Sequence, residues 1–142
     1  MIDRAPLTAA VRTMLTAATG RPCGLGGLPL VDGRPAPLPY SVLYPLGGLV
    51  GGSPFADYSE DACPAFQVTI VGARTDQAEW LADRVRRAFL QRTPAGDWEQ
   101  PVTAPGLNVW ARELLVDEGA DPVGGDVVTY IQRYKLAATA TA

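Results

Sequence analysis

The sequence predicts an α+β domain with a mainly antiparallel four-stranded sheet and two helices packed on it. Two stretches, residues 5–19 and 75–90, carry apolar residues at helical spacing, and four others have the composition or alternation of strands. The expected order is α-β-β-α-β-β, and neighbouring strand pairs favour antiparallel pairing. The length of 142 residues fits a single domain, 1–142, with its own core.

The first helix is expected over residues 5–19. Pro6 suits its first turn, where a missing N–H breaks no helical hydrogen bond, and Gly20 is a typical terminator. The residues of its apolar face are Leu7, Val11, Met14, Leu15 and Ala18. Residues 20–38 are rich in Gly and Pro and show no hydrophobic period, so a long loop is expected there.

Two strands are expected before the second helix. Residues 39–46 (PYSVLYPL) alternate in strand fashion, and Pro45 favours an edge position or a bulge. A Gly-rich loop, 47–54, and an acidic continuation, 57–61, should follow. The clearest strand is 65–72, with Phe66, Val68 and Ile70 on one face and Gln67 and Thr69 on the other.

The second helix, TDQAEWLADRVRRAFL, is expected over residues 75–90. Thr75 or Asp76 could cap it, and Asp76 with Glu79 three residues later resembles a capping box. Acidic residues near its start and arginines near its end complement the helix dipole. Its apolar face consists of Ala78, Leu81, Ala82, Val85, Ala88 and Phe89.

A long connection, 93–108, should lead to two final strands, 109–116 and 127–138, joined by a hairpin loop, 117–126. Four carboxylates crowd this loop: Asp117, Glu118, Asp121 and Asp126. A solvated hairpin tip is the favoured explanation. A hard cation is the alternative, although the spacing fits no EF-hand.

The composition argues against an enzyme. The chain has no His, which excludes Ser–His and Cys–His catalysis and any His-ligated metal. Ser53 lacks the setting of a nucleophile elbow, and the Gly-rich segments 24–29 and 47–52 match no phosphate-loop motif. We therefore predict no catalytic residue, no metal and no cofactor. Cys23 and Cys63 show no CxxC spacing, and whether they pair is open.

Charge also limits the partners. The net charge is −3 and the pI about 4.8, which disfavours tight nucleic-acid binding. The arginines of 84–92 could contact phosphates, as in a DNA-binding accessory protein. Pairing with Asp83 and Glu79 on a solvated helix face is the favoured explanation. No stretch reaches the length of a membrane span, so no membrane partner is expected.

Trp80 occupies an unexpected position on its helix. At about 100° per residue, it lies roughly 140° from the centre of the apolar face. In one interpretation its ring stacks on an arginine or lies under a loop. In the other, Trp80 forms a subunit interface, because Trp and Arg are enriched at interface hot spots. The interface candidates are Trp80, Arg84, Arg87 and Asp83, and the open edges of a small sheet slightly favour this second interpretation.

Three segments resemble the tail terminator (tail completion) proteins of long-tailed bacteriophages, closest to the actinobacteriophage type. They are PYSVLYP (39–45), FQVTIVGARTDQAEWLADRVRRAFL (66–90) and VVTYIQRYKLAATA (127–140). The resemblance extends over about residues 7–136 and is most specific in 66–90. Residues 20–38 are not matched.

This resemblance implies a virion structural protein of the neck and tail, assembled in the host cytoplasm. Its copies would form a ring, a hexamer in this family, that caps the head-proximal end of the tail tube and ends tube polymerisation. Its partners would be other copies, the tail tube protein and the head–tail connector or stopper protein, while DNA would pass through the lumen without specific binding. Another neck protein is the alternative within this class. A small ligand-binding or enzymatic α+β domain is the alternative from a different class.

Overall fold

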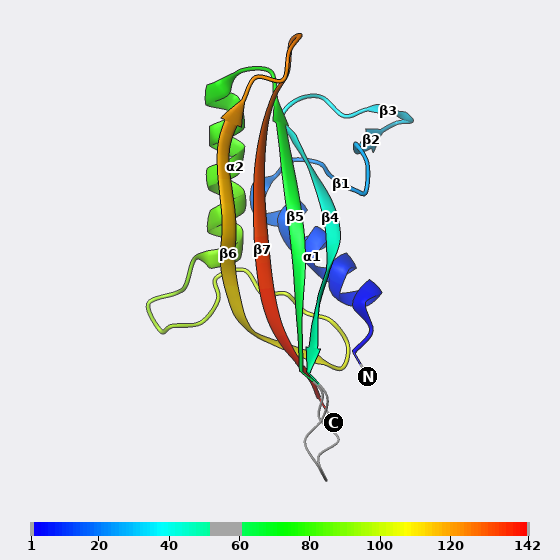
Figure 1. The fold of residues 1–142 in the computed structure, drawn as a ribbon, viewed down its shortest axis with the longest axis vertical. Coiled ribbons are helices and arrows are strands. Elements are labelled where there is room, and N and C mark those ends of the chain that lie inside the picture. Colours follow the sequence, from blue (N-terminus) through cyan, green and yellow to red (C-terminus); the bar gives the residue numbers. More distant parts are fainter. Residues whose placement is uncertain (1, 52–60, 142) are drawn as a thin grey trace.

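The computed structural model describes residues 2–51 and 61–141 and shows an α+β fold (Figure 1). A five-stranded sheet carries two helices on one face, and a small two-stranded sheet stands beside it. The elements in chain order are α1 (Arg4–Thr19), β1 (Cys23–Leu25), β2 (Leu30–Val31), β3 (Arg34–Pro35), β4 (Tyr40–Gly51), β5 (Asp61–Gly72), α2 (Thr75–Leu90), β6 (Leu107–Asp121) and β7 (Val128–Ala140).

The main sheet differs from the expected one by a fifth strand. Its order is β1-β4-β5-β7-β6, and all neighbours are antiparallel except β1 and β4, which are parallel. β1 lies within residues 20–38, so the prediction of a continuous loop there is wrong. Three residues are too few to show a period. Gly24 permits the following turn to fold tightly, because a Cβ there would lie 2.0 Å from the Gly27 carbonyl oxygen.

The second sheet is a hairpin within the same segment. β2 pairs with β3 through Leu30↔Pro35 and Val31↔Arg34. Asp32 and Gly33 form the turn and have φ angles of 53° and 77°. Positive φ at both turn residues is typical of a two-residue hairpin loop, for which Asp-Gly is a preferred sequence.

The core lies between the helices and one face of the sheet. Phe66, Val68 and Ile70 of β5 are buried there, as predicted, against the apolar faces of both helices. From β7, Tyr134 stacks on Phe89 of α2 with ring centroids 3.9 Å apart. Gln67 and Thr69 lie on the opposite sheet face and are partly exposed.

The start of α2 differs from the predicted cap. The N-cap residue is Arg74, and it makes no side-chain capping bond, so neither Thr75 nor Asp76 caps the helix. Instead, the Ala73 N–H donates to Oε1 of Gln77 (2.6 Å), while the Arg74 guanidinium attracts the Asp76 carboxylate. Gly72 brings β5 close to this turn, since a Cβ there would lie 2.9 Å from the Ala78 nitrogen.

Strands β4 and β5 extend beyond their predicted ends, so residues 47–51 and Asp61 belong to the sheet rather than to a loop. A register shift between Leu46 and Gly48 confirms the irregularity expected near Pro45. The rest of the expected Gly-rich and acidic loop, including Ser53, lies outside the described residues.

Strands β6 and β7 are also longer than predicted. Asp117 and Asp121 lie on β6, so the acidic cluster is not the tip of a single loop. Three register shifts interrupt the β6–β7 ladder, after Val109, Leu114 and Asp117. Such bulges break the regularity of an exposed edge strand. Both cysteines are free thiols, Cys23 buried and Cys63 partly buried.

Candidate subunit interface

Trp80 lies on the side of α2 that faces away from the core, and 44% of it is exposed. The guanidinium carbon of Arg84, one turn later, lies 4.4 Å from the centroid of its ring. The stacking predicted by the first interpretation is therefore present, and the ring is still accessible to a partner. An arginine stacked on an accessible indole is an arrangement suited to a protein contact.

A groove of about 400 Å³ adjoins this ring and is here named the Trp80 groove. Its walls come from three separate parts of the chain: the turn after α1, the residue before β4 and the first two turns of α2. Internal bonds hold them in place. The Arg21 side chain donates from Nε to the Pro39 carbonyl and from Nη2 to the Pro37 carbonyl, both at 2.9 Å. The lining residues are Arg21, Pro39, Arg74, Asp76, Gln77 and Trp80.

The electrostatics of the groove are dominated by arginines. Asp76 is its one carboxylate, and the hydrogen bond from Arg74 lowers the pKa of that carboxyl below its usual value. The side chain of Arg84, which stacks on Trp80, forms no ion pair within the described part of the chain. A complementary partner would therefore present a carboxylate beside an apolar group.

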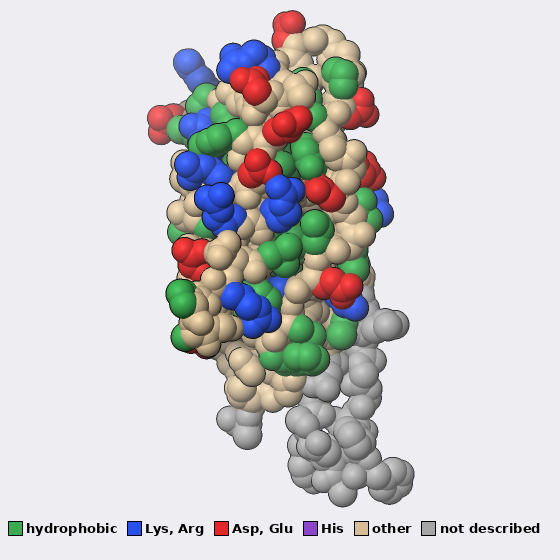
Figure 2. Space-filling model, turned by 90° about the vertical axis from the view of Figure 1, so that its left-hand side faces the viewer, with side chains coloured by type: hydrophobic (Ala, Val, Ile, Leu, Met, Phe, Trp, Pro, Cys, Tyr) green, Lys and Arg blue, Asp and Glu red, His purple; other side chains and the backbone are tan. Residues whose placement is uncertain are grey.

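The four interface candidates separate into two groups. Arg84 and Arg87 together line a smaller cavity of about 180 Å³ with Ala18, Glu99 and Gln100, so they continue the surface that begins at Trp80. Asp83 instead forms an ion pair with Arg86. Figure 2 views the molecule from the side that carries α2 in Figure 1, and its basic side chains alternate there with apolar and acidic ones.

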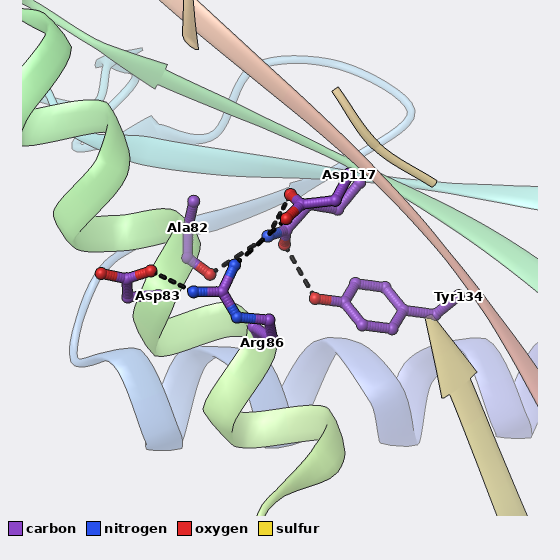
Figure 3. A network of polar contacts seen from close by, with 6 residues as sticks. Ala82, Asp83, Arg86, Asp117 and Tyr134 are labelled. Carbon is purple, nitrogen blue, oxygen red and sulfur yellow. Dashed lines mark hydrogen bonds and ion pairs between the residues drawn. The ribbon is translucent and has the colours of Figure 1, made fainter. Parts of the chain in front are cut away.

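Arg86 belongs to a polar network beneath α2 (Figure 3). Besides Asp83, it contacts Asp117 of β6, with 3.3 Å between Nη1 and Oδ2. The buried Gln132 donates to the Ala82 carbonyl and to Oδ1 of Asp117, both at 3.3 Å. Tyr134 completes the network by donating to Oε1 of Gln132 (2.8 Å). Asp117 was predicted at a solvated hairpin tip, but it joins β6 to α2.

This network gives the protein a testable alkaline response. Burial raises the pKa of Tyr134 far above its usual value of about 10. The folded state therefore keeps a proton that the unfolded state releases, and stability should fall as pH rises above about 10, by up to about 1.4 kcal/mol per pH unit. Tyr134→Phe should flatten this fall while costing about 1–3 kcal/mol at neutral pH, because Gln132 loses its donor.

Urea unfolding of the two proteins between pH 7 and 11 tests this expectation. Burial also lowers the pKa of Arg112, to about 10, which acts in the opposite direction. Both proteins contain Arg112, so its effect cancels in the difference. Parallel stability curves above pH 10 would contradict the assignment to Tyr134.

The end of α2 is held by a second cluster that the sequence did not reveal. The Trp98 ring contacts two guanidinium groups, with the carbon of Arg92 at 3.8 Å and that of Arg112 at 4.7 Å from its centroid. Nη1 of the buried Arg112 donates to the Phe89 carbonyl (3.2 Å) in the last turn of the helix. A cation there complements the helix dipole and satisfies a terminal carbonyl. These contacts fix the connection between α2 and β6.

Other large apolar side chains are exposed away from α2. Trp110 lies on the edge strand β6 and donates from its indole nitrogen to Oγ1 of Thr139 (3.0 Å). Leu115 is also exposed on this strand, and Val123 and Val127 lie at the β6–β7 turn. A separate group occupies the segment before β4: Leu25, Leu28, Leu30 and Val31.

The described residues contain no group of three or more acidic or Cys side chains that could hold a metal ion. Each of the three cavities along α2 includes a single carboxylate, from Glu99, Asp83 or Asp76. No helix in the described part of the chain is long and apolar enough to cross a membrane.

Comparison with known proteins gives a match in fold. No protein-family model matches the chain, and no curated protein matches it by sequence. A chain from the solved structure titled "Virion of native gene transfer agent (GTA) particle" is similar to it, with a TM-score of 0.58 and 16% sequence identity. The similarity covers 93% of both chains, so it extends over nearly the whole fold and not a shared fragment.

Proposed function

We propose that this protein is a virion structural protein, a tail terminator whose copies close a ring on the head-proximal end of a phage tail tube. The observation that carries the proposal is the fold shared over 93% of both chains with a component of a gene transfer agent virion. The sequence resemblance to tail terminators, most specific in residues 66–90, supports the same function independently. The ring would be a hexamer, as in that family.

The surface of the subunit is consistent with ring formation. A ring needs two different patches on each subunit, one for each neighbour. The Trp80 groove with Arg84 and Arg87 is one candidate patch. Exposed apolar side chains elsewhere, among them Leu30 and Trp110, offer candidates for the other. The cavities along α2 do not bring carboxylates together as an acid–base pair would require. A structural function is therefore favoured over an enzymatic one.

The proposal is tested by producing particles with and without the gene. The protein should be present in purified particles as one ring per tail, between the tube and the connector. Tubes assembled without it should continue past their normal length, because nothing ends their polymerisation. Absence from particles, or tubes of normal length without it, would contradict the proposal. A ring on the connector side that leaves tube length unchanged would identify another neck protein.

A further inference from the structure

We propose that residues 28–35 of one copy, here named the arm, insert into the Trp80 groove of the next copy. The arm contains the β2–β3 hairpin. The inference deepens the proposed function and rests on it, because it names the two patches that meet around the ring. It nevertheless concerns self-association, which can be measured without any particle.

The arm projects from the body of the protein. β2 and β3 pair with each other and with no strand of the main sheet. Figure 1 shows them extending beyond β4, on the opposite side of the molecule from α2. The base of the arm is fixed, because Pro29 and Ala36 are buried and the Ala36 N–H donates to the Pro29 carbonyl (2.9 Å). A two-stranded hairpin is only marginally stable by itself in water, so its tip gains stability from a partner.

The tip of the arm carries the groups expected of an inserted segment. Leu30 and Val31 are exposed large apolar side chains at the tip, where Leu30 is 63% exposed, and Leu28 adds a third exposed one at the base. Asp32 follows them at the turn. Apolar side chains concentrated on a projecting segment are typical of a protein contact.

The Trp80 groove is complementary to this tip. Trp80 and Pro39 contribute its apolar lining, and its open volume of about 400 Å³ has room for aliphatic side chains. Arg84, which stacks on the Trp80 ring, has no carboxylate partner among the described side chains, and Asp32 could provide one. The contact would thus place the apolar side chains of the arm against the apolar lining of the groove, and the Asp32 carboxylate beside the Arg84 guanidinium.

The occupant is a second copy and not the arm of the same chain. Arg21 binds the carbonyls of Pro37 and Pro39, so the segment that joins arm to groove is held at the groove wall. The arm also lies across the molecule from α2, beyond β4 (Figure 1). A contact between two different patches is heterologous, and repeated with a fixed rotation it closes a ring.

Mixing two defective variants tests this arrangement. Leu30→Asp should disable the arm, and Trp80→Ala should disable the groove. Each variant alone should remain monomeric at concentrations where the wild type forms its oligomer. When mixed, the intact arm of the Trp80→Ala protein can enter the intact groove of the Leu30→Asp protein. We therefore expect 1:1 heterodimers by analytical ultracentrifugation and no closed ring.

Val123→Asp is the matched control, since Val123 is 61% exposed and lies at the β6–β7 turn instead. It should assemble like the wild type. Circular dichroism should show all three variants folded, because each changed side chain is exposed and lies outside the core cluster. If the wild type assembles only on tail tubes, the same variants are tested by counting rings on tubes. Neither single variant should form rings there, whereas the control should.

Several outcomes would overturn the arm-to-groove contact. One is normal self-association of Leu30→Asp, and another is the absence of heterodimers from the mixture. If the Leu30→Asp protein still self-associates normally but is missing from particles, the arm would instead contact the tube or the connector. These results leave the proposed function standing. Conversely, heterodimers formed by a protein that is absent from particles would support the contact and contradict the function.

Discussion

Phe66→Ala should lower the free energy of unfolding of the isolated subunit by about 3–5 kcal/mol, the usual range for truncating a buried phenylalanine. Phe66 is buried on the helix-covered face of β5, where its register neighbours are Pro45 and Tyr134. Both helices and four strands, β1, β4, β5 and β7, contribute buried residues to the same core, so the cavity cannot close by moving one element. Urea unfolding followed by circular dichroism measures the effect.

Thr69→Ala is the control for this prediction. Thr69 lies on the same strand but on the other, partly exposed face, so its truncation should change stability by about 1 kcal/mol or less. Val68→Ala, on the buried face, should fall between the two. Equal losses for Phe66 and Thr69 would mean that the sheet is covered on both faces in the isolated subunit, contrary to the structure.

The long elements were predictable because burial imposes a period on them. The range expected for α2 agrees with the observed helix, that for α1 differs by one residue, and the inward face of β5 was read from alternation alone. β1 and the arm were missed for a physical reason. Strands of two or three residues show no period, and β1 exists through its pairing with β4. The Asp32–Gly33 pair was the local sequence feature that could have predicted the hairpin.

The sequence predicted which side of α2 carries the candidate interface, but it did not predict the groove beside Trp80. The rotation per residue of a helix places Trp80 away from the core, and Arg84 one turn later falls within stacking distance of it. The groove depends on Arg21 and Pro39, which approach α2 only in the folded chain. The same holds for Asp117 and Arg112, whose partners on α2 lie more than twenty residues away in the sequence.

Trp80→Ala should raise the dissociation constant for self-association by at least about 30-fold, which corresponds to about 2 kcal/mol, the threshold of an interface hot spot. The same change should alter the unfolding free energy of the subunit by less than about 1 kcal/mol. The two effects separate because the ring is supported mainly by Arg84 on its own helix and contributes little to the core. Sedimentation measures the first and urea unfolding the second.

Substitutions of the other two tryptophans, Trp98 and Trp110, are controls for the Trp80→Ala experiment. Trp98→Ala should destabilise the subunit itself, because its ring stacks with both Arg92 and Arg112 and holds the segment after α2. Trp110→Ala should leave assembly largely unchanged if the arm meets the Trp80 groove, although its side chain is more exposed than that of Trp80. Weaker assembly of Trp110→Ala with normal assembly of Trp80→Ala would move the interface to the β6 edge. A large stability loss in Trp80→Ala would show that its ring stabilises the fold rather than the assembly.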